Sequence, residues 1–294
     1  MTVRARPIIE LRPGEADYPG RLLDLRSPPD PLWLDGELPD LETPCVGIVG
    51  TRRMTPYGRQ AAREIAFGLA AAGVVVVSGL AQGIDSAAHE AALEARGRTV
   101  AVLGEGLLAF HRLGPERRRP LARAVKEHGA LVSEYPLDLG AQPWTFPRRN
   151  ATIAALSDAV VVIEAPRGSG ALITAKEAIA IRRPLFAVPG PIGAPTWLGS
   201  NDAIQDGMAR IVFGPAAIAA ELGVTLTTFG MEATAGAMGG RAVELLSSGA
   251  THPDELAAEL GISADAAATL IADLLLAGQI VSTADGRFAR ADSR

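Results

Sequence analysis

The segment GIVGTRRMTPYG (47–58) places small, hydroxyl-bearing and basic residues directly after an apolar run. Its candidate contact residues for an anion are Gly50, Thr51, Arg52, Arg53 and Thr55. A glycine allows close backbone approach, and a helix that starts here would expose unpaired N–H groups, so the turn suits one or two phosphates. It has neither the G-x-G-x-x-G spacing nor the Walker lysine. An ordinary strand-to-helix turn with exposed arginines remains the alternative.

A second segment, SGLAQGIDSAAHEAAL (78–93), repeats this theme. Gly79, Ala81 and Gly83 form its loop, and Asp85 follows near the expected helix start. Asp85 and His89 are four residues apart and would share a helical face, which makes an acid–base pair conceivable. We favour a structural interpretation, in which Asp85 caps the helix and His89 packs against it.

A third segment, WTFPRRNATIAAL (144–156), joins aromatic residues to a basic pair. Phe146 is followed by Arg148, Arg149 and Asn150. An aromatic face can stack on an unpaired base while neighbouring arginines bind the flanking phosphates, so the combination favours a single strand over a duplex. We also expect at least one of Trp144 and Phe146 to fill the core.

A fourth segment, APRGSGALITAKEAI (165–179), offers Ser169, Gly170 and Thr174 ahead of a helix. Small residues of this kind can receive a phosphate or admit another loop. Each segment is weak evidence by itself. If all four lie at one end of a sheet, they make a shared anion-binding surface.

The elements that must position these loops alternate between short β-branched runs and helical stretches from about residue 45 to about residue 213. The expected strands are 45–50, 74–78, 99–104, 130–135, 159–165 and 184–190. A helix over 57–73 ends on Gly73, a suitable C-terminal residue. This alternation predicts an α/β fold with a doubly wound, mostly parallel sheet of the Rossmann-like type.

The rest of the chain divides by composition. We expect residues 1–44 to be an extension packed on the core, 45–222 the Rossmann-like domain, 223–240 a linker and 241–294 a small C-terminal winged-helix domain of three helices and a hairpin. Residues 241–294 hold 4 Arg against 8 acidic residues, a net charge of −4. We therefore expect this domain to contact protein or stabilise a dimer rather than enter a major groove.

Composition excludes several classes of protein. The net charge of −5 argues against a general nucleic-acid coat, so binding must come from a local patch. Of 28 basic residues only Lys126 and Lys176 are lysine, a bias that a GC-rich genome explains as well as phosphate binding does. One cysteine and four scattered histidines predict no metal and no disulfide, and the absence of a long apolar run predicts a cytoplasmic protein without membrane contact.

The four segments, with GRTVAVLGEGL, LVSEYP, PLFAVPGPI and GSNDAIQDG, closely resemble the DNA-processing protein A family (DprA, also called Smf). The resemblance runs in order from about Tyr18 to about Met208. It implies an extended Rossmann-like domain that binds single-stranded DNA without catalysis or cofactor and self-associates as a homodimer. It also implies loading of the RecA recombinase on incoming strands, which the protein protects during natural transformation.

The same resemblance assigns residues by motif. Arg52 matches the phosphate-binding arginine of the G-S-R turn, with Thr51 in place of serine. The loop of Gly79, Ala81, Gly83 and Asp85 matches S-G-x-A-x-G-I-D. The other matches are Arg149 and Asn150 in F-P-x-R-N-R, and Ser169, Gly170 and Thr174 in S-G-x-x-x-T-A.

Two segments depart from the family pattern. Ala151 replaces the last arginine of F-P-x-R-N-R, and GEGLLAFHRLG (104–114) lacks the usual tyrosine-proline, so the loop around 110–119 is expected to be rebuilt. We interpret its HRLGPERRR run as a solvated surface stretch rather than a contact.

Two other functions remain open. The loop SGALITAKE faintly resembles that of Rossmann-like nucleotide phosphoribohydrolases, with Glu177 as the acid. A duplex-binding regulator that uses the winged helix is disfavoured by the acidity of that domain.

Overall fold

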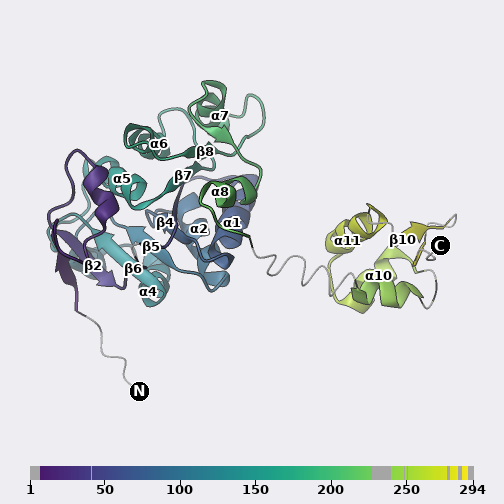
Figure 1. The fold of residues 1–294 in the computed structure, drawn as a ribbon. Helices are drawn as coiled ribbons and strands as arrows, with labels where there is room; N and C mark the ends of the chain where they lie inside the picture. The colour runs from purple at the N-terminus through teal and green to yellow at the C-terminus, as the bar shows by residue number, and fades with distance from the viewer. Residues whose placement is uncertain are drawn as a thin grey trace, which may run out of the picture. The chain divides into compact units, whose positions relative to one another are not determined.

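The computed structural model describes residues 7–40, 42–226, 240–247, 249, 251–276, 279–283 and 287–290. The chain divides into two compact units, Met1–Leu226 and Thr227–Arg294 (Figure 1). The strands of the first unit are β1 (Ile9–Leu11), β2 (Leu32–Gly36), β3 (Cys45–Val49), β4 (Val75–Ser78), β5 (Thr99–Val102), β6 (Gly129–Ser133), β7 (Ala159–Val162), β8 (Leu185–Ala187) and β9 (Arg210–Ile211).

The helices of this unit lie between the strands. The α-helices are α1 (Pro56–Ala71), α2 (Ile84–Glu94), α3 (Leu107–Leu113), α4 (Arg119–Glu127), α5 (Thr145–Leu156), α6 (Ala171–Ala180), α7 (Leu198–Gln205) and α8 (Ala216–Glu221). The 3₁₀ segments are η1 (Gly20–Asp24), η2 (Glu116–Arg118) and η3 (Pro195–Trp197).

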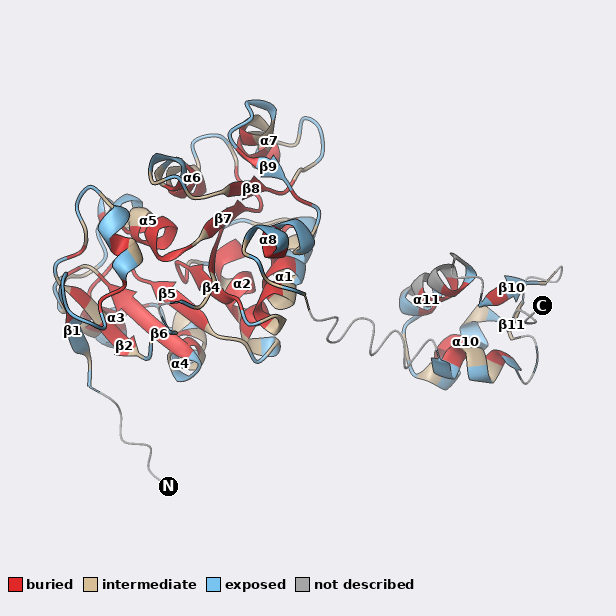
Figure 2. Ribbon diagram, viewed as in Figure 1, coloured by how far each residue is buried: buried red, intermediate tan, exposed pale blue. Residues whose placement is uncertain are grey.

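The sheet of the first unit has nine strands in the order β1-β2-β6-β5-β4-β3-β7-β8-β9. The pairs from β6 through β9 are parallel, and all six strands expected from the sequence are present. Strands β3 to β8 are buried along their whole length, which explains why they read as continuous rather than alternating apolar runs (Figure 2). The prediction of a doubly wound, mostly parallel α/β fold is confirmed.

Helices cover both faces of this sheet. Buried residues of α5 and α6 form one apolar cluster with β3, β4, β5, β6 and β7. Those of α1 and α2 form another cluster on the opposite face of the sheet. Helix α1 begins where Thr55 Oγ1 accepts a hydrogen bond from the Gly58 N–H at 3.0 Å, and Pro56 occupies its first turn. The chain turns at Gly73, whose φ of 85° favours glycine.

The N-terminal segment contributes strands that the sequence did not reveal. Strand β2 pairs antiparallel with β6, with Trp33 opposite Ser133, and β1 adds antiparallel to β2. Tyr18 and Leu22 are buried in the apolar cluster under α5. Short β1 ends one side of the sheet, and the two-residue β9 ends the other.

The second unit is a small winged helix. It comprises a helix over 240–247, then α10 (Pro253–Leu260), α11 (Ala264–Leu276) and an antiparallel hairpin of β10 (Ile280–Ser282) and β11 (Phe288–Arg290). Ala242, Leu246, Leu256, Ile271 and Ile280 form its core. The predicted linker includes 227–239 and the predicted hairpin turn lies at 285–286, and both segments fall outside the described residues.

Candidate nucleic-acid interface

The strand order creates a crevice at the carboxyl ends of β3 and β7. From β3 the chain winds outward to β4, β5 and β6, and from β7 it winds the other way to β8 and β9. Loops after neighbouring strands therefore diverge here, which is where doubly wound sheets bind ligands. A pocket of about 430 Å³ lies at this point, lined by Val49, Gly50, Arg52, Ala81, Asp85, Pro143, Phe146, Pro147, Arg149, Asn150, Ser169, Gly170, Ala171, Ile173 and Thr174.

All four sequence segments contribute to this pocket, and their loops are bonded to one another. The Thr51 N–H donates to the Glu164 carbonyl at 2.7 Å, and the Ile84 N–H donates to the Thr51 carbonyl at 3.2 Å. A Cβ on Gly50 would lie 2.5 Å from Ile84, and one on Gly83 would lie 2.3 Å from the Thr51 carbonyl. The two glycines are required because a side chain on Gly50 would collide with Ile84 of the second loop, and one on Gly83 would collide with the backbone of the first loop.

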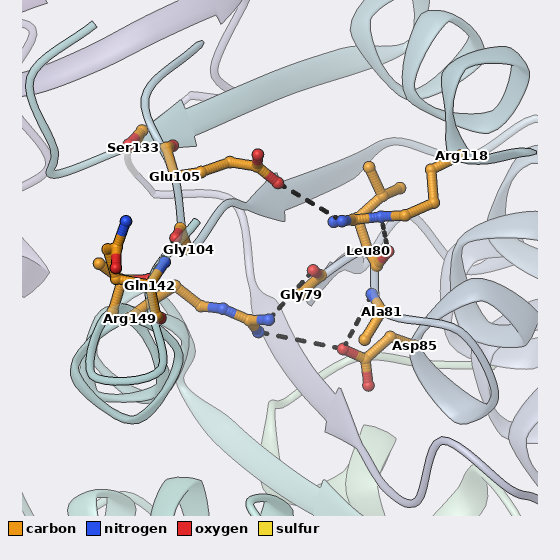
Figure 3. A network of polar contacts seen from close by, with 11 residues as sticks. Gly79, Leu80, Ala81, Asp85, Gly104, Glu105, Arg118, Ser133, Gln142 and Arg149 are labelled. Atoms are coloured by element: carbon orange, nitrogen blue, oxygen red, sulfur yellow. Dashed lines mark hydrogen bonds and ion pairs between the residues drawn. The ribbon is translucent and has the colours of Figure 1, made fainter. Parts of the chain in front are cut away.

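Arg149 braces the second loop from inside. Its side chain is buried, Nη2 donates to the Gly79 carbonyl at 3.2 Å, and Nη1 lies 3.9 Å from Asp85 Oδ2 (Figure 3). A Cβ on Gly79 would collide with the guanidinium, so this glycine makes room for Arg149. Burial lowers the pKa of Arg149, and the Asp85 charge opposes that shift.

The capping role predicted for Asp85 is corrected. The N-cap of α2 is Gly83, without a side-chain cap, and the Asp85 carboxylate instead accepts from the Ala81 N–H at 3.4 Å. Burial raises the pKa of Asp85, while the Arg149 charge and the N–H groups of Ala81 and Gly79 oppose that rise. Asp85 therefore shapes the loop ahead of its helix rather than the helix end itself.

Arg118 lies beside this network and was not predicted to contribute. It belongs to the HRLGPERRR run that we interpreted as solvated, yet its side chain is only 15% exposed. Its Nε donates to the Leu80 carbonyl at 2.8 Å, and Nη1 reaches Glu105 Oε1 at 3.5 Å (Figure 3). The guanidinium also stacks over Phe110, 5.3 Å from the ring centre. The solvated interpretation is wrong for Arg118. The charged sequence alone does not indicate which of its arginines is buried.

Arg52 and Phe146 form the accessible part of the pocket. Arg52 is exposed, and its Cζ lies 5.3 Å from the centre of the half-buried Phe146 ring. Phe146 packs on Gly104, where a Cβ would approach the ring to 2.8 Å. The expectation that Trp144 or Phe146 fills the core is wrong, because Trp144 is 53% exposed and contacts Tyr135 edge-on. Both rings therefore keep surface available for stacking.

Thr174 supplies a hydroxyl with no partner. Thr174 is fully buried, lines the pocket, and its Oγ1 makes no hydrogen bond to any described residue. Thr174 is the fourth residue of α6, which begins at Ala171, and the Asn150 amide holds the loop before this helix by donating to the Gly170 carbonyl at 2.9 Å. Unmet polar groups next to a helix N-terminus suit an anionic oxygen.

Six predicted contact residues do not line the pocket: Thr51, Arg53, Thr55, Gly79, Gly83 and Arg148. Thr55 Oγ1 donates to the Glu164 carboxylate at 3.0 Å, and Thr51 Oγ1 accepts from the Arg53 N–H at 3.2 Å. Arg148 pairs with Glu134 at 2.9 Å. The hydroxyls thus shape the first loop, with the buried Glu164 at the end of β7 as an anchor that the sequence did not indicate.

The geometry disfavours the catalytic pairs considered from the sequence. His89 is fully buried, and its Nδ1 lies 2.7 Å from Thr99 Oγ1, so it does not face Asp85 as an acid–base partner. Burial lowers the pKa of His89 to about 3. Glu177 lies outside the residues that line the pocket.

The described part of the chain contains no cluster of three or more His, Cys, Asp or Glu side chains that could hold a metal ion. Within the same residues, every helix is too short or too polar to cross a bilayer.

Known proteins resemble about two thirds of this chain. The Smf protein of Escherichia coli is 43% identical over 204 residues, which are 69% of this chain and 54% of that protein. The DprA protein of Bacillus subtilis is 38% identical over 66% of this chain and 65% of its own length. With respect to the Smf proteins of E. coli and Synechocystis, the match spans about half the relative's length, 54% in each case.

Two solved structures share the fold. DprA of Streptococcus pneumoniae superposes with a TM-score of 0.67 at 34% identity, over 74% of this chain and 75% of that one. DprA of Helicobacter pylori, solved to explain its binding of single-stranded DNA, gives a TM-score of 0.65 at 30% identity, over 73% and 95%. The DNA recombination-mediator protein A family model matches residues 10–223, and the DprA winged-helix model matches 232–286. The chain therefore belongs to the DNA recombination-mediator protein A family.

Proposed function

We propose that the carboxyl edge of the first unit's sheet binds single-stranded DNA without catalysing a reaction. One observation carries this proposal: an exposed guanidinium over an aromatic ring, Arg52 on Phe146, stands at the mouth of a pocket that also holds the unpartnered Thr174 hydroxyl. The guanidinium and hydroxyl suit a phosphate, and the ring suits an unstacked base. The H. pylori relative that binds single-stranded DNA supports this assignment.

The contact set of this proposal separates into two layers. Arg52, Phe146, Asn150, Ser169, Gly170 and Thr174 line the pocket and touch the strand, with Gly50 and Ala81 allowing its close approach. Arg149, Asp85, Gly79, Gly83, Thr51 and Thr55 hold the loops in place. Arg53 and Arg148 lie outside the pocket and add positive charge near it.

We test this by fluorescence anisotropy with single-stranded and duplex oligonucleotides over a salt series. We expect tighter binding of the single strand and a loss of more than about tenfold in affinity for Arg52→Glu, because the substitution places a carboxylate where a phosphate binds. Equal affinity of the variant and the wild type would overturn the site assignment. Incubation with nucleoside monophosphates should release no free base.

Family membership supports a wider role for this chain. We propose a cytoplasmic homodimer, formed through the Rossmann-like unit, that protects incoming strands and loads a RecA-type recombinase in natural transformation. The winged helix, with its net charge of −4 from 4 Arg and 8 acidic residues over 241–294, suits a protein partner better than phosphate. Co-sedimentation of RecA with strands already coated by this protein tests the loading role.

A further inference from the structure

A second hollow, of about 1040 Å³, runs beside α4. It lies between that helix, the end of β2 and the loop that leads into β5. Its lining residues are Gly36, Glu37, Arg96, Gly97, Arg98, Phe110, His111, Arg119, Ala122, Arg123, Lys126, Glu127, His128, Gly129 and Leu131. We call this surface the α4 groove.

The α4 groove has the opposite sign of charge to the chain as a whole. Its lining includes five arginines and lysines against two glutamates, whereas the whole chain has a net charge of −5. His111 and His128 also line the groove. A local positive surface on an acidic protein is the pattern expected of a specific polyanion contact.

Helix α4 presents its cations on one side. Arg119, Arg123 and Lys126 follow at helical spacing, and the rise between the first two is about 6 Å. Within the described part of the chain, neither Arg119 nor Arg123 pairs with a carboxylate, and Arg119 Nη2 donates to the Arg112 carbonyl instead. Their charge is therefore available to a ligand.

The other cations are anchored. The buried Asp35 carboxylate contacts Lys126 Nζ and accepts a hydrogen bond from His111 Nε2 at 2.8 Å. Arg98 donates to the carbonyls of Glu37 and Leu38. These contacts fix the shape of the groove and leave Arg96, Arg119 and Arg123 as its free charges among the described residues.

The α4 groove is connected to the candidate pocket through η2. Arg118, the last residue of η2, donates to the carbonyl of Leu80, the residue before Ala81 of the pocket lining. Arg119 is the next residue and lines the groove. A chain of arginines thus leads from the mouth of the pocket to α4.

We propose that the α4 groove binds the sugar–phosphate backbone of the same single strand where it leaves the pocket, through Arg119, Arg123 and Arg96. This inference rests on the proposed function of the pocket. The groove would hold phosphates without reading bases, since it offers cations, and Phe110, the one Phe, Tyr or Trp side chain in its lining, is buried. Its contribution should therefore depend on strand length and on salt.

The test compares the full-length wild type with Arg119→Ala/Arg123→Ala by anisotropy, on a short oligothymidine that fills only the pocket and on one several times longer. On the long strand we expect weaker binding and a slope of log K against log salt that is shallower by about 1.4, two contacts at about 0.7 each. On the short strand we expect no change. A matched pair, Arg123→Glu and Arg26→Glu, controls for net charge, because exposed Arg26 follows η1, which packs on α5 at the other face of the sheet.

The outcomes are separable from those of the pocket. Loss of affinity on the long strand alone, with Arg26→Glu unchanged, supports the proposal. Wild-type affinity of the double variant on the long strand overturns it, as does a loss confined to duplex DNA or a loss shared equally by Arg26→Glu. Arg52→Glu should weaken both strand lengths, and its failure to do so would instead refute the pocket. Thermal unfolding checks that each variant is folded.

Discussion

Two arginine pairs, Arg52–Arg53 and Arg148–Arg149, look alike in the sequence but do different work in the structure. Arg52 and Arg53 are both exposed in the turn after β3. In the second pair, Arg149 is buried against Gly79 and Asp85, and Arg148 pairs with Glu134. The first pair therefore leaves both guanidiniums accessible to a ligand, whereas both guanidiniums of the second pair lie against carboxylates of the protein.

The difference arises from the local backbone. The second pair lies in α5 (Thr145–Leu156), where adjacent residues point about 100° apart, so one side chain enters the interior while the other faces outward. The first pair lies in a turn whose backbone is held by Glu164, and neither side chain is directed into the core. A basic dipeptide in a packed helix thus has one of its two guanidiniums buried here, whereas the dipeptide in the turn keeps both exposed.

The largest effect is expected from truncating Arg149, the buried residue of the second pair. We expect Arg149→Ala to lower the free energy of unfolding by about 3–5 kcal/mol, because it leaves the Asp85 carboxylate buried without its countercharge. Urea denaturation measures the loss. Arg149→Ala/Asp85→Ala should recover part of it, and a single variant as stable as the wild type would show that Arg149 is not a brace.

Arg52→Ala should show the opposite pattern. Because Arg52 is exposed, we expect its removal to leave the free energy of unfolding, measured in urea, within about 0.5 kcal/mol of the wild type. Its single-strand affinity should fall by about 1.5–3 kcal/mol, the usual size of a hydrogen bond to a charged group. Arg53→Ala is the control, since Arg53 lies outside the pocket and should lose less affinity.

These contrasts mark what the sequence could and could not predict. The six parallel strands followed from β-branched runs bounded by helices, and the meeting of four loops followed from the rule that parallel strands end at one edge. Strands β1, β2 and β9 were missed because strands of two to five residues carry little apolar periodicity. The burial of Arg118 and Arg149 was missed because it depends on contacts between segments far apart in the chain.

The Thr174 hydroxyl tests whether an uncharged group of the pocket also contributes to binding. Thr174→Val keeps the shape of the side chain but deletes the unpartnered Oγ1, so we expect single-strand affinity to fall by about 0.5–1.5 kcal/mol. The free protein should be no less stable, because a buried hydroxyl without a partner is itself unfavourable. An unchanged affinity together with raised stability would assign Thr174 to the core alone.

Arg148→Ala should have the smallest effect. The side chain of Arg148 is 60% exposed and that of its partner Glu134 is 5% exposed, so the pair should contribute up to about 1 kcal/mol to stability at neutral pH. Burial raises the pKa of Glu134, and the Arg148 charge opposes that rise. Removing Arg148 therefore raises the pKa further, and the variant's deficit should shrink as the pH falls and Glu134 becomes protonated in both proteins. Unfolding in urea at pH 7 and at pH 5 measures the two deficits, and a deficit that grows toward pH 5 would show that Arg148 stabilises the fold by packing rather than by charge.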